Sequence, residues 1–212
     1  CGENVILIDP FITPNPQSSH ILLKDITAKW ILVTHGHDDH IADLEALLIQ
    51  NNATLICNHE IANWYQKKGY QHIMGMNIGG SITIGETTIH MTSALHSSSL
   101  PDGSYGGNPA GFVVSHANKN CYFAGDTGLS AEMSVLAQQF TLNASFLPIG
   151  DRYTMGYKDA LLASKMLETE MTIGMHYNTF EALNIDKQAA QQYFIDNNKK
   201  LTLLEVGDKI EL

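Results

Sequence analysis

Short apolar runs separated by turn residues dominate this chain, and they predict more strands than helices. The run at 5–8 is typical of a buried strand, because it is brief and ends at Asp9 and Pro10, which do not continue a sheet. The segment "GGSITIGETTIHMTSAL" alternates apolar and polar positions around a Gly-Glu turn and predicts a β-hairpin. Strands are predicted at 5–8, 30–34, 53–57, within the hairpin 79–95, and at 112–116, 121–125, 144–150, 171–175, 201–205 and 208–212.

A second pattern, with apolar residues three and four positions apart, predicts the helices. Apolar residues at 41, 44, 47 and 48 predict a helix over 39–50 with acidic residues in its first turns. The other helices are predicted at 60–68, 129–140, 156–169 and 186–196. No repeat, low-complexity tract or linker interrupts these elements. The chain 1–212 is therefore expected to form one domain of the α/β or α+β class, with sheet buried between helical layers.

The composition limits the classes of partner and the cell compartment that we expect for this protein. Lys and Arg total 12 against 22 Asp and Glu, a formal net charge of −10, which argues against nucleic-acid and membrane partners, although a local basic pocket could still hold a small anion. No apolar run reaches the roughly 18 residues of a membrane span. The three cysteines include no CxxC pair, so a disulfide framework or zinc ribbon is not expected. Cys57 and Cys121 are predicted to be small core residues, and a reducing, cytoplasmic location is expected.

The candidate chemistry begins directly after the predicted strand 30–34. His35, His37, Asp39 and His40 follow the pattern HxHxDH. These offsets do not share one helix face, and they fit a strand end that turns into a helix. Imidazole nitrogens and carboxylate oxygens are suitable ligands for zinc, manganese or iron. The alternative is a polar loop that is rich in histidine by chance.

Three further candidate ligands also lie at the ends of predicted strands. His96 follows "HMTSAL", Asp126 ends "CYFAGD", and His176 follows "TIGM". Each of them alone would be interpreted as an ordinary loop residue. Together they have the residue types and the positions that a metal site built from several strand ends requires.

These motifs resemble a known family. The segments "THGHDDH", "ALHSSS", "FAGDTG" and "GMHYNTF", in this order, resemble the metallo-β-lactamase superfamily. With "GGNPAGFVV" and "LPIGDRYTMG", the set is similar to one branch, the metal-dependent hydrolases related to ascorbate-6-phosphate lactonase. The similarity runs from "ILIDPF" to about Phe180.

The resemblance implies a four-layer αββα sandwich with a dinuclear site that holds two divalent ions, Zn or Mn. It implies that a hydroxide shared by the two ions is the nucleophile, and that Asp39 shuttles a proton. Asp39 and His176 are the candidate catalytic residues. The implied ligands are His35, His37 and His96 for the first ion, Asp39, His40 and His176 for the second, and Asp126 as the bridge.

One segment of the family pattern is missing from this sequence. The family usually has a "GHSCF"-like segment before "ILIDPF", whereas this chain begins "CGENVILIDPF". We therefore expect either a piece of a longer protein or a sandwich that lacks its first N-terminal strands.

Several residues near the predicted site have two interpretations each. Asp9 is either a turn-starting residue or the partner that orients a metal-bound histidine. Thr154 is either the N-cap of the helix at 156–169 or, like its neighbours, a substrate contact. The candidate substrate contacts are Arg152, Tyr153, Thr154, Tyr177, Asn178 and Thr179.

The function predicted from these features is hydrolysis of a small-molecule ester, lactone or phosphoester. The alternatives are a phosphodiesterase or nuclease of the same superfamily, which the net charge argues against, and a non-catalytic metal-binding scaffold, which the intact ligand set argues against. A di-iron redox variant is disfavoured because those relatives usually replace one histidine of the motif with Glu, and His37 is intact. Assembly as a homo-oligomer is left open, since compact branches of the family often assemble.

Overall fold

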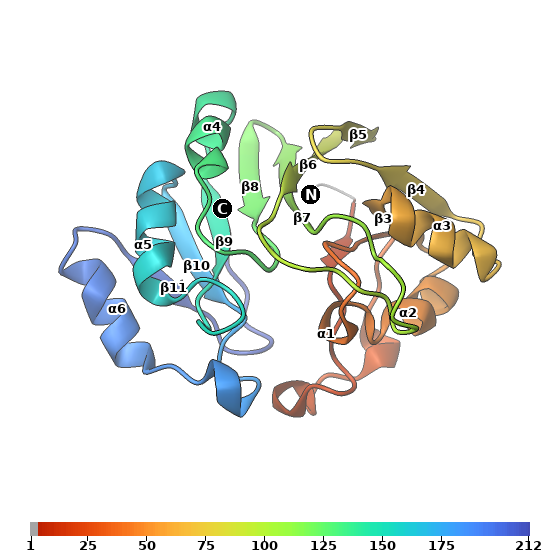
Figure 1. The fold of residues 1–212 in the computed structure, drawn as a ribbon, viewed down its shortest axis with the longest axis horizontal. Helices are drawn as coiled ribbons and strands as arrows, with labels where there is room; N and C mark the ends of the chain where they lie inside the picture. The colour runs from red at the N-terminus through yellow and green to blue at the C-terminus, as the bar shows by residue number, and fades with distance from the viewer. Residues whose placement is uncertain (1–3) are drawn as a thin grey trace.

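Two β-sheets that face each other form the centre of the protein, whose computed structural model describes residues 4–212 (Figure 1). The first sheet has the strand order β1-β2-β3-β4, and all of its strands are parallel. The register pairs Leu7 with Ile31 and Ile31 with Leu55. Its strands are β1 (Ile6–Ile8), β2 (Trp30–Leu32), β3 (Thr54–Asn58) and β4 (Ile73–Met76).

The second sheet has seven strands in the order β11-β10-β9-β8-β7-β6-β5. Strands β5 to β8 pair antiparallel, with two-residue turns between β5 and β6 and between β7 and β8 and the long segment 94–109 between β6 and β7. Strands β8 to β11 pair parallel and are connected through helices. The strands are β5 (Ser81–Ile84), β6 (Thr87–Ser93), β7 (Ala110–His116), β8 (Lys119–Phe123), β9 (Ala144–Pro148), β10 (Met171–Met175) and β11 (Leu201–Leu203).

Helices cover the outer face of each sheet and complete an αββα arrangement (Figure 1). Apolar residues of α2 and α3, such as Leu47 and Ile61, pack on the first sheet. Those of α4, α5 and α6, such as Leu136, Leu161 and Phe194, pack on the second. The helices are α1 (Asp38–Ile41), α2 (Leu44–Asn51), α3 (His59–Lys67), α4 (Glu132–Gln139), α5 (Tyr157–Met166) and α6 (Lys187–Ile195), with short 3-10 turns η1 (Pro16–Ser18), η2 (Leu23–Asp25) and η3 (Glu181–Leu183).

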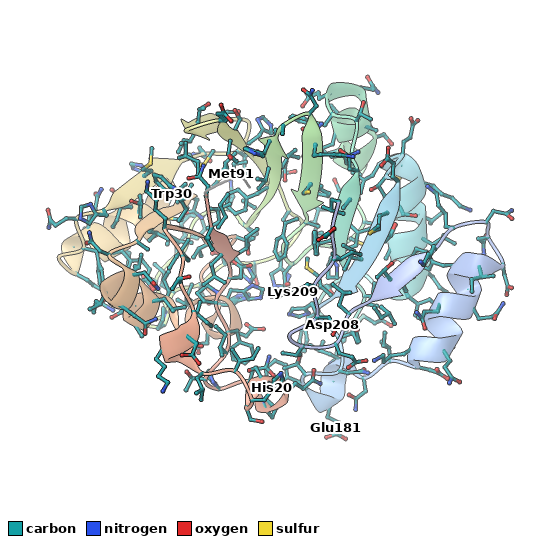
Figure 2. The ribbon with its side chains drawn as sticks, turned by 180° about the vertical axis from the view of Figure 1, so that it is seen from behind. His20, Trp30, Met91, Glu181, Asp208 and Lys209 are labelled. Carbon is teal, nitrogen blue, oxygen red and sulfur yellow. The ribbon has the colours of Figure 1, made fainter. Side chains whose placement is uncertain are left out.

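A third apolar core lies between the two sheets. Leu32 and Ile56 from the first sheet pack with Ile89, Met91 and Phe112 from the second, and all five are fully buried. Figure 2 shows Met91 in this region. Residues of β6 alternate between buried and half-buried, as a strand with one face on this core requires. The predicted four-layer metallo-β-lactamase sandwich is confirmed, with β1 at one edge of the first sheet.

Two of the predicted elements were wrong, and one strand was missed. The helix predicted over 39–50 is divided into α1 and α2, because the backbone N–H of Asp43 donates to Pro10 O and its carboxylate accepts from Ile12 N and Thr13 N. These bonds to the segment after β1 take the place of a helical turn at this point. Strand β4 was not predicted, since "IMGM" is short and interrupted by a glycine. Residues 208–212 form no strand.

The described residues confirm the cysteine prediction in part. Cys57 is fully buried in the core beneath α3, as predicted, whereas Cys121 on β8 is only half-buried. Cys1 lies outside the described residues. Within 4–212, no helix has both the length and the apolar character that crossing a membrane requires.

Candidate metal centre

The candidate site lies at one edge of the sandwich, where strands that run in the same direction end. His35 and His37 follow β2, Asp126 follows β8, and His176 follows β10 directly. Strand β6 runs parallel to β8, because both are antiparallel to β7, so His96 after β6 reaches the same edge. The carboxyl ends of like-directed strands meet at one place, and there the fold brings together residues distant in sequence.

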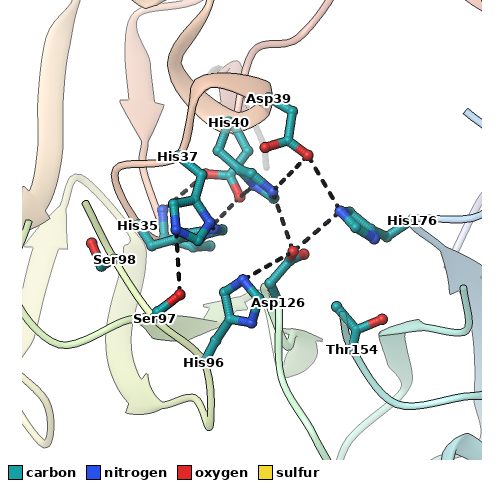
Figure 3. A network of polar contacts seen from close by, with 12 residues as sticks. His35, His37, Asp39, His40, His96, Ser97, Ser98, Asp126, Thr154 and His176 are labelled. Atoms are coloured by element: carbon teal, nitrogen blue, oxygen red, sulfur yellow. Dashed lines mark hydrogen bonds and ion pairs between the residues drawn. The ribbon is translucent and has the colours of Figure 1, made fainter. Parts of the chain in front are cut away.

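Three imidazoles form a first group (Figure 3). His35 Nε2 lies 2.9 Å from His37 Nδ1. The ring of His96 stands edge-on to both of these rings, with 5.1 Å between centroids in each case. One nitrogen from each of the three residues lies within 4.8 Å of the other two. Three nitrogens that converge in this way can hold one ion and leave a coordination position open.

Asp39, His40 and His176 form a second group (Figure 3). Asp39 Oδ2 lies 3.7 Å from His40 Nε2 and 3.5 Å from His176 Nε2. The rings of the two histidines are stacked, with centroids 5.7 Å apart. This group offers one oxygen and two nitrogens to a second ion, and it lies beside the first because His40 also packs on His35.

Asp126 connects the two groups. Its Oδ2 lies 3.5 Å from His96 Nε2 in the first group, and 3.6 Å and 3.1 Å from His40 Nε2 and His176 Nε2 in the second (Figure 3). The residue is only 4% exposed. Asp126 therefore occupies the place between the groups that its predicted bridging role requires.

Asp9 holds His40 from the side that faces away from the centre. Asp9 Oδ2 lies 2.8 Å from His40 Nδ1 and accepts a hydrogen bond from Thr34 Oγ1 at 2.6 Å, while Oδ1 accepts from Thr34 N at 2.8 Å. With Nδ1 bonded to this carboxylate, His40 presents Nε2 to the centre. Asp9 has φ +47°, a left-handed conformation that Asp and Asn tolerate better than most residues. Of the two interpretations of Asp9, the orienting one is confirmed by these contacts.

Two hydroxyl groups contact the outward nitrogens of other imidazoles. Thr34 Oγ1 lies 3.0 Å from His35 Nδ1, which leaves Nε2 for the centre. Ser97 Oγ lies 3.4 Å from His37 Nε2, which leaves Nδ1 for the centre. Partners of this kind set the tautomer and the ring orientation of a metal-binding histidine.

Burial and neighbouring carboxylates set the charges of the imidazoles. Burial lowers the pKa of His35 far below its usual value, and the adjacent histidines lower it further, so its ring is neutral at physiological pH. Burial also opposes a charge on His40, but Asp9 and Asp126 outweigh it and raise the pKa of His40 above its usual value. An ion that binds His40 must therefore displace a proton from Nε2.

The two carboxylates of the centre are ionised. Burial favours the neutral acid at Asp39, but His176 and His40 outweigh it and lower the pKa of Asp39 to about 2. Burial likewise opposes the charge on Asp126, and His40 foremost lowers its pKa below the usual value. Ionised carboxylates are the form that binds cations.

The donor atoms fit divalent metal ions. Within the part of the chain that the structure describes, His40 Nε2, Asp126 Oδ1 and His176 Nε2 are buried and form no hydrogen bond. A buried polar atom without a partner costs roughly 1–3 kcal/mol, so these atoms require a ligand. Zinc and manganese both accept mixed histidine and carboxylate sites.

The backbone at His176 is held in an unusual conformation. Its φ is +55°, which costs of order 1–3 kcal/mol for a residue other than glycine. The segment after β9 packs directly against it, since a Cβ added at Gly150 would lie 2.2 Å from His176 O. The absence of a side chain at Gly150 therefore allows this segment to support His176.

A cavity of about 630 Å³ opens onto the centre. One side of it is formed by the candidate ligands, and Asp38 and Ser97 also line it. The remaining lining residues are Phe11, Pro14, Tyr153, Phe180 and Leu183, of which sequence reasoning found only Tyr153. Phe11 follows the strand end at Asp9, and Phe180 lies four residues after His176. The sequence signal that could have identified these two residues was therefore their proximity to strand-end motifs.

The six predicted substrate contacts lie on different sides of His176. Tyr153 lines the cavity at the centre. Tyr177, Asn178 and Thr179 instead line a second cavity of about 710 Å³, which also borders His176. There Asn178 Oδ1 accepts a hydrogen bond from Ile185 N at 2.7 Å, which closes the turn after β10. Substrate contact by these residues stays a prediction.

The other two predicted contacts lie in the turn before α5. The guanidinium carbon of Arg152 lies 5.5 Å from the ring centroid of Tyr153. The backbone N–H of Thr154 donates to Asp151 O at 3.0 Å, and Figure 3 shows Thr154 beside the centre. The alternative role of Thr154 as a helix N-cap is wrong, because α5 begins at Tyr157 and its N-cap is Gly156.

Known proteins resemble this chain over most of its length. Residues 4–177 match the family model described as beta-lactamase superfamily domain. A UPF0173 metal-dependent hydrolase of Christiangramia forsetii is 43% identical over 212 residues, which cover 100% of this chain and 93% of the relative. Igni18, a novel metallo hydrolase from Ignicoccus hospitalis, has a TM-score of 0.87 and 35% identity, with 97% of this chain and 89% of that chain covered. An isothiocyanate hydrolase from Delia radicum gut bacteria shares the fold at 21% identity, with a TM-score of 0.78 and 98% and 92% of the two chains covered.

Proposed function

We propose, from the premise that the chain belongs to the beta-lactamase superfamily and is a metal-dependent hydrolase, that it holds two divalent ions and hydrolyses a small-molecule ester, lactone or phosphoester. The observation that carries this proposal is the position of Asp126 between two groups of three donor residues. A single structural ion would need only one such group. The relation to ascorbate-6-phosphate lactonase stays a prediction.

The proposed ligand atoms follow from the contacts of each imidazole. A nitrogen that bonds to Asp9, Thr34 or Ser97 is not free for an ion, so the other nitrogen is the ligand. For His96 and His176, Nε2 is chosen because it is the nitrogen that lies close to Asp126 Oδ2. The first ion is assigned to His35 Nε2, His37 Nδ1 and His96 Nε2, the second to His40 Nε2, His176 Nε2 and an oxygen of Asp39, and Asp126 is assigned to both.

The ions would supply Lewis acidity, which activates water near neutral pH and stabilises negative charge on the substrate oxygen. Asp39 is ionised at neutral pH and its side chain is 28% exposed beside the cavity, so we assign it the transfer of the proton that the attacking water releases. His176 Nε2, 3.5 Å from Asp39 Oδ2, keeps that carboxylate at the edge of the centre. Zinc and manganese are the proposed ions, because the donor set accepts both.

Metal content per chain tests this proposal most directly. Elemental analysis of protein purified without chelator should find about two ions per chain in the wild type, one in His96→Ala and one in His176→Ala. His72→Ala, an exposed histidine outside the centre, is the matched control and should keep both. Full metal content together with full hydrolysis in Asp126→Ala would refute the proposal.

A nuclease of the same superfamily remains the alternative substrate class. The formal net charge of −10 opposes binding of a phosphate backbone. Saturable RNA binding that weakens steeply with salt would favour this alternative over a small-molecule substrate.

A further inference from the structure

The cavity at the metal centre has two chemically different sides. The candidate ligands form one side, and Phe11, Pro14, Tyr153, Phe180 and Leu183, here called the apolar wall, form the other. The volume of about 630 Å³ lies within the range typical of small-molecule sites. A molecule whose reacting group faces the ligands must place the rest of its atoms along this wall.

The apolar wall is assembled from loops that are distant in sequence. Phe11 belongs to the loop after β1, Tyr153 to the turn before α5, and Phe180 to the loop after β10. The rings of Phe11 and Phe180 lie 6.0 Å apart between centroids, tilted by 37°, within the range of stabilising aromatic pairs. This contact joins the N-terminal and C-terminal parts of the fold in the lining of the cavity.

Part of the wall remains open to solvent. Phe180 is 44% and Tyr153 is 59% exposed, although both side chains border the cavity. Large apolar side chains that stay accessible beside a reactive centre are typical of binding surfaces. Leu183, at 2% exposure, forms the buried part of the wall.

The lining offers no cationic side chain to an anionic group. Among the described residues that line this cavity there is no Lys or Arg, and Asp38 is the charged residue that is not a candidate ligand. Arg152 is outside the lining and lies near the ring of Tyr153. An anionic group away from the reacting centre would therefore meet apolar carbon and the carboxylate of Asp38, with only the neutral hydroxyls of Ser97 and Tyr153 as side-chain donors among the described lining residues that are not candidate ligands.

We infer that the substrate is a neutral carboxylic ester or lactone whose apolar arm, an alkyl or aryl group, packs against the apolar wall. The inference rests on the proposed function and names its substrate class. Water adds across the acyl carbon–oxygen bond, which yields a carboxylic acid and an alcohol, or one hydroxy acid from a lactone. A substrate that carries a phosphate on its arm is disfavoured by the same wall.

Three methyl esters with the same leaving group test whether an apolar arm raises kcat/KM. Methyl hexanoate and monomethyl adipate have six-carbon acyl chains that end in a methyl group and a carboxylate, respectively, and methyl acetate has no arm. Each buried methylene is worth about fourfold in kcat/KM, so burial of only two of the four extra carbons of methyl hexanoate gives the metal-loaded protein a preference of about tenfold or more over methyl acetate. We expect a preference of about the same size over monomethyl adipate, because its terminal carboxylate would have to lose water against the apolar wall. Proton release measured in a pH-stat gives the rates.

Variants of the wall connect the preference to Phe180. Phe180→Ala should lower the ratio of kcat/KM for methyl hexanoate to that for methyl acetate about tenfold, and Phe180→Leu should restore most of it. Ile195→Ala, which truncates a 59% exposed residue on α6, is the control and should leave the ratio unchanged. A preference for monomethyl adipate that Arg152→Gln removes would overturn the inference and assign the arm to Arg152.

A binding measurement separates this inference from the proposed function. Acetohydroxamate and hexanohydroxamate chelate metal ions, are not ester substrates, and differ only in the arm, so their affinities can be compared by calorimetry on the metal-loaded protein. Equal affinities would overturn the inference even if esters are hydrolysed. At least tenfold tighter binding of hexanohydroxamate, reduced in Phe180→Ala, would support binding of an apolar arm by the wall. The absence of hydrolysis of every ester would then count against the proposed hydrolysis and the ester class, and not against the apolar arm.

Discussion

Replacing Asp9 by Asn should weaken metal binding by reversing the tautomer of His40. The Asp9 side chain is 6% exposed, and its Oδ2 accepts from both Thr34 Oγ1 and His40 Nδ1. In Asp9→Asn an amide NH2 can replace this oxygen, so it donates to Nδ1 instead of accepting from it. His40 would then carry its proton on Nε2, the nitrogen that faces the centre. The substitution adds no backbone strain, because Asn tolerates the φ of +47°.

The expected loss of metal affinity follows from the role of residues that, like Asp9, hydrogen-bond to a metal-binding histidine. Loss of a carboxylate that orients a metal-bound histidine costs typically 10–100-fold in affinity, or about 1.4–2.7 kcal/mol. The loss should fall on the ion of the Asp39, His40 and His176 group. The other group should be affected less, since the Thr34 hydroxyl can still contact His35 Nδ1. We expect kcat/KM at limiting metal to fall in parallel.

Stepwise metal affinities, measured by competition with a chromophoric chelator, check this prediction. Asp43→Asn is a matched control, because Asp43 is a buried aspartate that also accepts two hydrogen bonds, but from the backbone of Ile12 and Thr13. It should lower stability and leave metal affinity within a factor of a few. If Asp9→Asn binds both ions as tightly as the wild type, the tautomer argument is refuted.

Three further predictions concern stability and the support of His176. Without metal, lowering the pH from 6.5 to 5.5 should destabilise the fold by about 1 kcal/mol through His35, because its lowered pKa keeps it neutral in the folded state while the unfolded state binds the proton. The stability that the raised pKa of His40 contributes is nearly complete at pH 6.5 and offsets only about 0.3 kcal/mol of this loss, so urea midpoints should fall. Metal at 100 times its Kd should add about 2.7 kcal/mol per site, or about 5.4 kcal/mol for two sites, so chelator should lower the Tm by roughly 10–20 °C in calorimetry. Gly150→Ala should lower the free energy of unfolding by about 1–3 kcal/mol and reduce the metal content by one ion per chain in a metal assay, because the new Cβ collides with His176 O. Gly128→Ala, whose new Cβ has open space around it, should change neither quantity.

Local sequence patterns were sufficient to predict an element whose structure depends on its own residues. The hairpin predicted within 79–95 forms as β5 and β6, because alternation around a Gly-Glu turn is a property of neighbouring residues. They were insufficient where a distant segment intervenes. The helix predicted over 39–50 is interrupted at Asp43 by hydrogen bonds to the segment 10–13, which helical spacing does not encode.

The candidate ligands could be found in the sequence because each follows a strand that the apolar pattern already predicts. The cavity could not be found in this way. Phe11 and Phe180 carry no motif, and their contact requires that loops 169 positions apart meet in the lining of the cavity. Tyr177 and Asn178 directly follow His176, yet the backbone turn at His176, with φ +55°, places them along the second cavity.

The sequence by itself determined which chemistry is available: histidines and aspartates at strand ends, in an order shared with the beta-lactamase superfamily. It could do so because residue type and strand pattern are local properties. Only the tertiary structure decided how these groups are used. Asp126 lies between the two groups, Asp9 sets the nitrogen that His40 presents, and aromatic side chains face the centre because packing joins segments that no local rule relates.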